Sequence, residues 1–547
     1  MRKNIFLCIL FGLLFASCYE DKGNYDYLGF PNLEMKLFEV VTDSETGEEV
    51  EREFGYIRVK SGDVVKIRPH LENNTEDNYS NLEYKWIYKD QVISTEKTLV
   101  WETSEVGEGS VVLEVNDPTY GTRFISSFSI HIESAYNSSG FLILDEKDGK
   151  KRLSFLMGGY YYDTKEFSPR ISLYSEENDG KELPGGAFKI HMHFRRADEN
   201  SQIMVVAPDD LVDINAYTFK EAMRGEDMFR GQIPEISDVM FMQWVDLAAD
   251  TQGRLYRRIK STNELFHSNQ FLDTPLTDEN GEEYRGIRFI PGNLSKSFGL
   301  MLDTEKNRYL AVSDYRNYNG SKHTLGKIMP IVYNDNGETE WPEGYTPLDN
   351  MGDAEVLFTG HYFYPSIDVY LYRTTQYFSV IRKGGKYYYQ YFQVHLSDDA
   401  SSAYVTDFLE SEFKGLEPLM DENTHFELMR QAQGYDYSRM QPYLLIAKGN
   451  ELHLFDINRV GDEKPSGTTV KLFEFPSPIV AMDGQSPLGS QLGVGLEDGS
   501  FYVLNMPGAK NMAMDEEKLV IQKLPVGTFG QFTDVLYNIM EQAPSLY

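Results

Sequence analysis

Apolar and polar residues alternate along much of this chain, which is the pattern of β-strands that bury one face. Between residues 31 and 135 the alternation recurs in short runs separated by turn residues. The clearest runs are Leu82-x-Tyr84-x-Trp86, Val111-x-Leu113-x-Val115 and residues 124–132. Each run places large apolar side chains on one face of a strand. The pattern therefore predicts a small all-β domain over residues 31–135.

Residues 136–547 carry a repeated unit made of an apolar strand, a polar turn and a second strand. The unit occurs seven times, with turns near residues 148, 209, 252, 306, 384, 449 and 498. The mean step, (498 − 148)/6, is about 58 residues, which leaves room for two further strands in each unit. We therefore predict a seven-bladed β-propeller over residues 136–547, with a run of sandwich domains as the alternative. Helical periodicity is confined to residues 219–224, 409–413 and 533–540.

The first residues have the pattern of an export signal. Arg2 and Lys3 precede an apolar run over residues 5–15, and Phe15-Ala16-Ser17-Cys18 is a small-residue cleavage site that ends in cysteine. The run is about eleven residues long, whereas a membrane-spanning helix needs roughly 20. We expect residues 1–17 to be removed as a lipoprotein signal peptide, Cys18 to carry the lipid, and residues 18–30 to form a lipidated tether. An ordinary secretory signal beside a cysteine is the alternative.

Composition limits the partners of the mature chain. Removing residues 1–17 takes away Arg2 and Lys3 and no acidic residue, so the net charge becomes −33 − 2 = −35. Such a charge repels nucleic acid, which we exclude as a partner. Cys8 lies in the removed segment, so Cys18 has no cysteine left to pair with. With 41% hydrophobic and 14% aromatic residues the chain can still bury substantial cores.

The strand motifs also resemble a known family. Tyr84-x-Trp86, then Val111-x-Leu113-x-Val115-x-Asp117, Gly121 and the run 124–132 resemble a PKD-type immunoglobulin-like sandwich without a disulfide. Together with Cys18-Tyr19-Glu20-Asp21-Lys22-Gly23-Asn24-Tyr25, they resemble the PKD-like family lipoproteins of Bacteroides-type bacteria. The chain departs from the PKD pattern at Ile87-Tyr88-Lys89-Asp90, where a glycine-and-aspartate turn is usual.

The resemblance implies a location and a set of partners. Glu20 and Asp21 directly after the cysteine resemble the export tag of surface-exposed lipoproteins. The expected location is the outer membrane, lipid-anchored and facing the cell exterior. The family further implies association with uptake systems built on a TonB-dependent channel and its surface lipoprotein.

Residues that could carry chemistry are few. His191 and His193 share one face of a predicted strand and could bind a metal, but no third ligand is evident, so ordinary strand histidines are favoured. The acidic pairs 209–210 and 516–517 could serve glycoside hydrolysis, yet 85 acidic residues supply such pairs by chance. No G-x-S-x-G, phosphate-binding loop or H-E-x-x-H motif occurs. We predict no catalytic residue, no metal and no cofactor.

Clustered tyrosines are the candidate binding surface. They lie in residues 362–365 and 387–392, and we single out Tyr362, Tyr364 and Tyr388. Alternation puts Tyr388 on the opposite face from Tyr387 and Tyr389, so one of the two faces is expected to be semi-exposed. Exposed tyrosine stacks on sugar rings or anchors protein interfaces. Plain packing between blades is the alternative interpretation.

Two functions are consistent with these patterns. The first is a non-catalytic cell-surface lipoprotein that binds a glycan or peptide, or assists its uptake. The second is an extracellular propeller hydrolase that acts on polysaccharide or peptide. Two or more inward carboxylates at the propeller axis would favour hydrolysis, whereas aromatic and amide groups there would favour binding.

Overall fold

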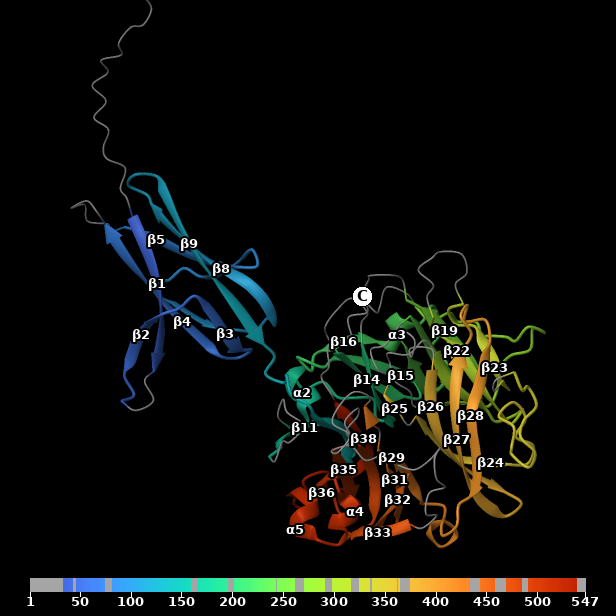
Figure 1. Ribbon diagram of the computed structural model, residues 1–547. Coiled ribbons are helices and arrows are strands. Elements are labelled where there is room, and N and C mark those ends of the chain that lie inside the picture. Colours follow the sequence, from blue (N-terminus) through green and yellow to red (C-terminus); the bar gives the residue numbers. More distant parts are fainter. Residues whose placement is uncertain are drawn as a thin grey trace, which may run out of the picture. The chain divides into compact units, whose positions relative to one another are not determined.

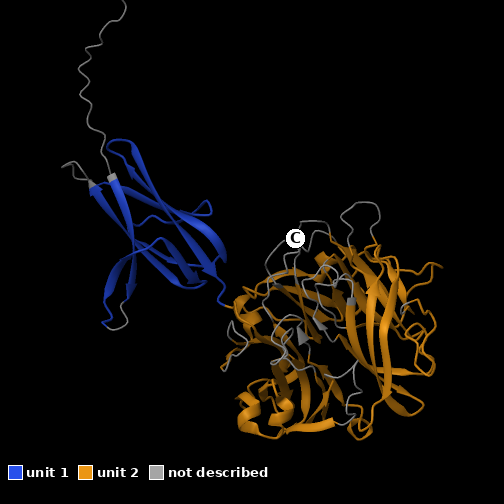
Figure 2. Cartoon of the chain, viewed as in Figure 1, with its two compact units in different colours: residues 1–135 blue, residues 136–547 orange. Residues whose placement is uncertain are grey.

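The computed structural model describes most of the chain after residue 32. The described residues are 33–42, 46–73, 81–158, 166–194, 201–242, 244–260, 270–290, 298–315, 324–334, 337–361, 363–364, 374–429, 431–432, 443–457, 469–484 and 490–538. Two compact units make up the chain, residues Met1–Ala135 and residues Tyr136–Tyr547 (Figure 2). The predicted signal, Cys18 and the tether lie outside the described residues.

The first unit is an immunoglobulin-like β-sandwich, as predicted. One sheet has the strand order β2-β1-β4-β7 and the other β3-β9-β8-β5-β6. The strands are β1 (Leu33–Thr42), β2 (Glu49–Glu53), β3 (Tyr56–Lys60), β4 (Val64–Asn73), β5 (Glu83–Tyr88), β6 (Gln91–Ser94), β7 (Leu99–Glu102), β8 (Gly107–Asp117) and β9 (Thr122–Glu133). Trp86, Leu113 and Ile130 are fully buried between the sheets. The motif residues that carry the family resemblance thus form its core.

The turn that departs from the PKD pattern still closes a tight hairpin between β5 and β6. Lys89 and Asp90 have φ angles of 45° and 64°. Two consecutive positive φ angles are those of a type I′ turn, which matches the twist of paired strands. Lys89 and Asp90 thus adopt the conformation that glycine usually provides.

The described strands of the second unit group into seven blades, which we call blades 1 to 7, and blades 4 and 5 belong to one eight-stranded sheet. The strands are labelled in Figure 1. Blade 1 is β38 (Gln531–Asn538), β10 (Gly140–Lys147), β11 (Lys150–Met157) and β12 (Ser168–Arg170); blade 2 is β13 (Lys189–Phe194), β14 (Ser201–Ala207), β15 (Asp210–Asn215) and β16 (Glu221–Arg224); blade 3 is β17 (Ile236–Phe241), β18 (Val245–Asp250) and β19 (Leu255–Ile259); blade 4 is β20 (Ile287–Ile290), β21 (Phe298–Asp303), β22 (Arg308–Ser313) and β23 (Ile328–Tyr333). Blade 5 is β24 (Glu355–His361), β26 (Thr374–Lys383), β27 (Lys386–Leu396) and β28 (Ala403–Glu412); blade 6 is β29 (His425–Leu428), β31 (Tyr443–Lys448), β32 (Glu451–Asp456) and β33 (Thr469–Glu474); blade 7 is β34 (Ile479–Gly484), β35 (Gln491–Leu496), β36 (Phe501–Asn505) and β37 (Val520–Leu524). Short helices α2 (Leu173–Glu177), α3 (Gly225–Met228), α4 (Ala509–Met512) and α5 (Glu516–Leu519) lie between strands.

The seven blades close into a ring. Neighbouring blades approach each other at their first strands, with β38 beside both β34 and β13, and β29 beside both β24 and β34. Strand β38, from the C-terminal part of the chain, completes blade 1 by pairing antiparallel with β10. Blades 4 and 5 are also joined at their outer edges, where β23 pairs parallel with β28. The second unit is therefore a seven-bladed propeller. The pairing of β38 with β10 closes the ring, so these two strands do not expose unpaired backbone groups to each other.

The seven predicted turns are confirmed, because each lies between the second and third strands of one blade, counted from the innermost strand. At Asp148-Gly149 and Gly384-Gly385 both turn residues have positive φ, which glycine adopts without strain.

The predicted helical segments are wrong: residues 221–224, 409–412 and 533–538 belong to β16, β28 and β38. Their strand pairing with distant segments overrides the weak local periodicity.

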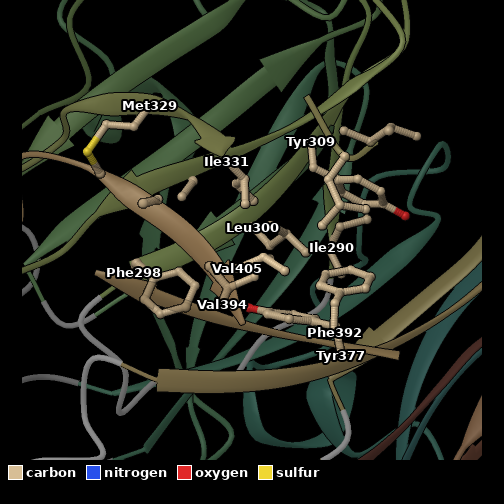
Figure 3. Close-up of a cluster of buried hydrophobic side chains, with 14 of the residues drawn as sticks. Ile290, Phe298, Leu300, Tyr309, Met329, Ile331, Tyr377, Phe392, Val394 and Val405 are labelled. Atoms are coloured by element: carbon tan, nitrogen blue, oxygen red, sulfur yellow. The ribbon is translucent and has the colours of Figure 1, made fainter. Parts of the chain in front are cut away.

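Apolar layers between blades hold the ring together. The layer between blades 4 and 5 is drawn in Figure 3, where Ile290, Phe298 and Leu300 of blade 4 pack with Tyr377 and Phe392 of blade 5. Equivalent layers join blades 2 and 3, 3 and 4, 5 and 6, 6 and 7, and 7 and 1. Each blade thus buries both faces, which is why its middle strands are almost continuously apolar.

Candidate site on the inner strands of blades 1 to 3

Four ionisable side chains on the innermost strands of blades 1, 2 and 3 form what we call the inner site. Lys189 and His191 lie on β13, Asp238 on β17 and Asp534 on β38. The side chains of Lys189, His191 and Asp238 are 33%, 23% and 17% exposed. These three side chains therefore keep contact with water, and Asp534 is half-buried.

Asp238 accepts hydrogen bonds from Lys189 and His191 of blade 2. His191 Nε2 lies 3.0 Å from Asp238 Oδ1, and Lys189 Nζ donates to Oδ2 at 2.8 Å. The backbone N–H of Val239 also donates to Oδ1, at 2.8 Å. Burial by itself would raise the pKa of Asp238, but the hydrogen bonds from His191 and Lys189 outweigh it and lower the pKa to about 2. Asp238 is thus an ionised carboxylate that fixes both partners.

His191 is held as a neutral imidazole. Burial lowers its pKa, against the opposing effect of Asp238. Since Nε2 faces the carboxylate, the Nε2–H tautomer is favoured and the lone pair lies on Nδ1. No hydrogen bond joins Nδ1 to any described residue, and Nδ1 is not among the buried side-chain atoms without a partner in the described part of the chain. This nitrogen is therefore at least partly accessible to water.

Asp534 links blade 1 to blade 2. Its Oδ2 accepts the backbone N–H of Ile190 at 2.8 Å, and its Oδ1 accepts that of Val535 at 3.0 Å. Burial raises the pKa of Asp534 to about 7, and the nearby charge of Asp483 acts in the same direction. The carboxyl group is consequently close to half protonated at neutral pH.

Carboxylates on other inner strands make the same kind of bond between blades. Asp483 of blade 7 accepts the N–H of Tyr537 in blade 1 at 2.5 Å, and Glu427 of blade 6 accepts the N–H of Gly484 in blade 7 at 3.4 Å. These acids help to hold successive inner strands in register. The inner site differs because a histidine and a lysine converge on its carboxylate.

The histidine pair predicted from the sequence shares one face of β13, and each histidine is hydrogen-bonded to a different aspartate. His193 is fully buried, with Nε2 3.0 Å from Asp213 Oδ1 and its ring stacked on Phe241. His191 is bound instead to Asp238. Within the described part of the chain, no group of three or more His, Cys, Asp or Glu residues could hold a metal ion.

Of the other sequence candidates, only Tyr388 and the acidic pairs have side chains in the described part of the chain. Tyr388 is half-buried on β27, packs against the layer between blades 4 and 5, and has the Lys383 ammonium 5.0 Å from its ring centre. Tyr364 belongs to β25 (Phe363–Tyr364), which pairs with β30 (Gln431–Ala432), but its side chain lies outside the described part. Tyr362 and Cys18 are outside it entirely. The acidic pairs 209–210 and 516–517 lie on a blade 2 hairpin and on α5.

Sequence reasoning missed the inner site apart from His191. Asp238 and Asp534 are single acidic residues in ordinary strands, and no local motif marks them. Lys189 has one available signal, because it shares the alternating face of β13 with His191.

Comparison with known proteins finds a family match for the N-terminal part of the chain. Residues 18–186 match the PKD-like family. The match confirms the resemblance seen in the sequence and extends over β10, β11 and β12 of blade 1. No curated protein sequence matches the chain.

Two solved structures match the chain with low sequence identity. A quinonprotein alcohol dehydrogenase-like protein from Bacteroides thetaiotaomicron has 12% identity and a TM-score of 0.37, covering 91% of this chain and 99% of that one. Apo AztD from Citrobacter koseri has 9% identity and a TM-score of 0.33, covering 72% of this chain and 83% of that one.

Proposed function

Proceeding from the PKD-like family match over residues 18–186, we propose that this chain is an outer-membrane lipoprotein that faces the cell exterior and binds a glycan or peptide as an accessory of a nutrient uptake system. The observation that carries the proposal is the start of that match. It begins at residue 18, the cysteine at which the signal pattern places cleavage and lipid attachment. The lipid would then anchor the chain, and the sandwich would act as a spacer before the propeller.

The propeller suits a binding role because its frame is rigid. Seven blades share apolar layers, and β38 ties the last part of the chain to blade 1. Rigid frames position binding residues on their connecting loops with little entropic cost. Among the described residues, no helix has the length and apolarity needed to cross a membrane.

The anchor is tested by replacing Cys18 with alanine. We expect C18A to fold like the parent and to leave the membrane fraction, because acyl chains on this sulfur and on the mature amino terminus supply the attachment. Membrane retention of C18A would contradict the proposal. Whole-cell protease treatment of the parent protein tests its orientation, since an outward-facing chain is digested without lysis.

The binding role is tested by calorimetric titration of the mature chain with neutral oligosaccharides and with mixed peptides. Saturable binding of either class is expected. Tyr388→Ala tests the tyrosine that the sequence singled out: a binding role predicts weaker affinity at unchanged thermal stability. Unchanged affinity with a lowered melting temperature would assign Tyr388 to blade packing.

A further inference from the structure

Independently of the proposed function, we propose that the interface between blades 2 and 3 holds an internal water molecule, bound by the side-chain amide of Gln202. The site lies inside the propeller, where a layer of buried polar side chains is found between the two blades. It depends neither on the lipid anchor nor on a glycan or peptide ligand.

The packing between blades 2 and 3 changes from apolar to polar along the strands. Met204 of β14 and Tyr256 of β19 belong to the apolar part. Gln202 precedes Met204 by two residues, and Arg258 follows Tyr256 by two. Strand alternation therefore places Gln202 on the same face as Met204 and Arg258 on the same face as Tyr256. Both lie in the polar part of the interface.

The polar part contains charged groups that are buried and paired. Asp213, Asp246 and Arg258 are no more than 1% exposed. Arg258 donates to Asp246 Oδ2 from Nε at 3.0 Å and from Nη2 at 2.8 Å, and Lys260 Nζ lies 2.9 Å from Asp246 Oδ1. His193 Nε2 lies 3.0 Å from Asp213 Oδ1. The two carboxylates balance the arginine and the lysine, so the layer has no excess of these charges that would favour a bound ion.

The amide of Gln202 differs from these paired groups. Its side chain is fully buried, and neither Nε2 nor Oε1 has a hydrogen-bond partner among the described residues. Exchanging the two atoms by rotating the amide does not help, because both positions lack a partner. Burying an amide without hydrogen bonds is costly, and buried polar groups in folded proteins are nearly always paired with protein or with ordered water. The Gln202 amide therefore requires a further partner.

Water has the chemistry that this amide needs. It accepts a hydrogen bond from Nε2 or donates one to Oε1, and an internal water typically makes about three such bonds. The residues opposite Gln202 in the strand pairings are also polar, His193 on β13 and Asn215 on β15. Polar surroundings of this kind retain water, whereas apolar cavities stay empty.

The test compares the mature parent chain with Gln202→Leu by magnetic relaxation dispersion of the water oxygen, which measures the amount of water held inside a protein. The variant should lose the contribution of at least one water molecule. Met204→Leu is the matched control, because Met204 is fully buried on the same face of β14 and the exchange conserves volume. The control should keep the parent's dispersion amplitude.

Thermal unfolding of the propeller gives a second readout. An amide that is bonded through water stabilises the fold, so Q202L should melt at a lower temperature than the parent. Replacing an unpaired amide with an apolar side chain of similar size would instead raise the melting temperature. A folded Q202L variant with the parent's dispersion amplitude, or with a higher melting temperature, would overturn the inference.

A high-resolution crystal structure of the parent decides the question even if Q202L does not fold. We expect a water molecule within about 3.2 Å of Nε2 or Oε1 of Gln202. Apolar side chains in contact with both amide atoms, with no water between them, would overturn the inference.

Discussion

Replacing Asp534 with asparagine should destabilise the propeller at low pH and stabilise it at high pH. In the folded chain the pKa of Asp534 is about 7, against 3.8 for an unperturbed aspartate. A group whose pKa is raised by folding favours the folded state at low pH and opposes it once the folded form ionises. Asparagine cannot ionise and so avoids that cost.

The magnitude follows from the pKa difference. Ionising Asp534 in the folded chain costs about 4 kcal/mol at pH 8 and about 1 kcal/mol near pH 4.5, at 1.36 kcal/mol for each pKa unit. Asparagine has one oxygen and therefore loses one of the bonds to Ile190 and Val535, at about 1 kcal/mol. Asp534→Asn should thus stabilise the propeller by about 3 kcal/mol at pH 8, be neutral near pH 4.5 and destabilise it by about 1 kcal/mol at lower pH.

The assay is calorimetric unfolding of the mature parent and the D534N variant across this pH range, with the propeller transition analysed separately. Asp238→Asn is the companion variant, and it should destabilise the propeller at neutral pH. Its folded-state pKa is about 2, so the carboxylate stabilises the fold at neutral pH by about 2 kcal/mol, and this contribution disappears as the pH falls through 2. A D534N variant that is equally or less stable than the parent at pH 8 would refute the account of Asp534.

Two further substitutions test the fold. Gly493→Ala should destabilise the propeller by about 1–3 kcal/mol, because its methyl group would lie 2.6 Å from Cδ1 of Phe141 across the blade 7 and blade 1 layer; Gly185→Ala, where nothing lies within 4 Å, is the control, and equal melting temperatures for the two variants would argue against that packing. Trp86→Ala should destabilise the sandwich by about 3–5 kcal/mol, because Trp86 is fully buried and its Nε1 donates to the Glu96 carbonyl at 2.9 Å. The calorimetric transition of the propeller should not move in W86A, and a shift in that transition would contradict separate unfolding of the two units.

The architecture could be predicted from the sequence because its repeated element is local. Each blade contains a hairpin whose turn is marked by residues such as Asp148-Gly149 or Gly384-Gly385, between strands that are apolar on both faces. Alternation in β5, β8 and β9 likewise identified the sandwich core. These signals occupy fewer than about twenty consecutive residues, so no distant contact is needed to recognise them.

Ring closure and the inner site could not be predicted in this way. Strand β38 pairs with β10 from the opposite end of the propeller, and its own residues carry a weak helical period. Asp534 reaches Ile190, and Asp238 reaches His191, only after the blades have closed into a ring. The tyrosine-rich strand β27 shows that composition alone does not reveal burial: Tyr389 and Tyr391 are buried because they lie in the apolar layer between blades 5 and 6.

The most direct test of the proposed function is purification of the tagged, lipidated protein from native membranes in mild detergent, followed by identification of the proteins that accompany it. The proposal predicts stoichiometric recovery of a TonB-dependent channel together with its surface lipoprotein, and loss of both when Cys18→Ala is purified in the same way. Recovery of the lipidated protein alone, under conditions that preserve other uptake complexes from the same membranes, would contradict the accessory role.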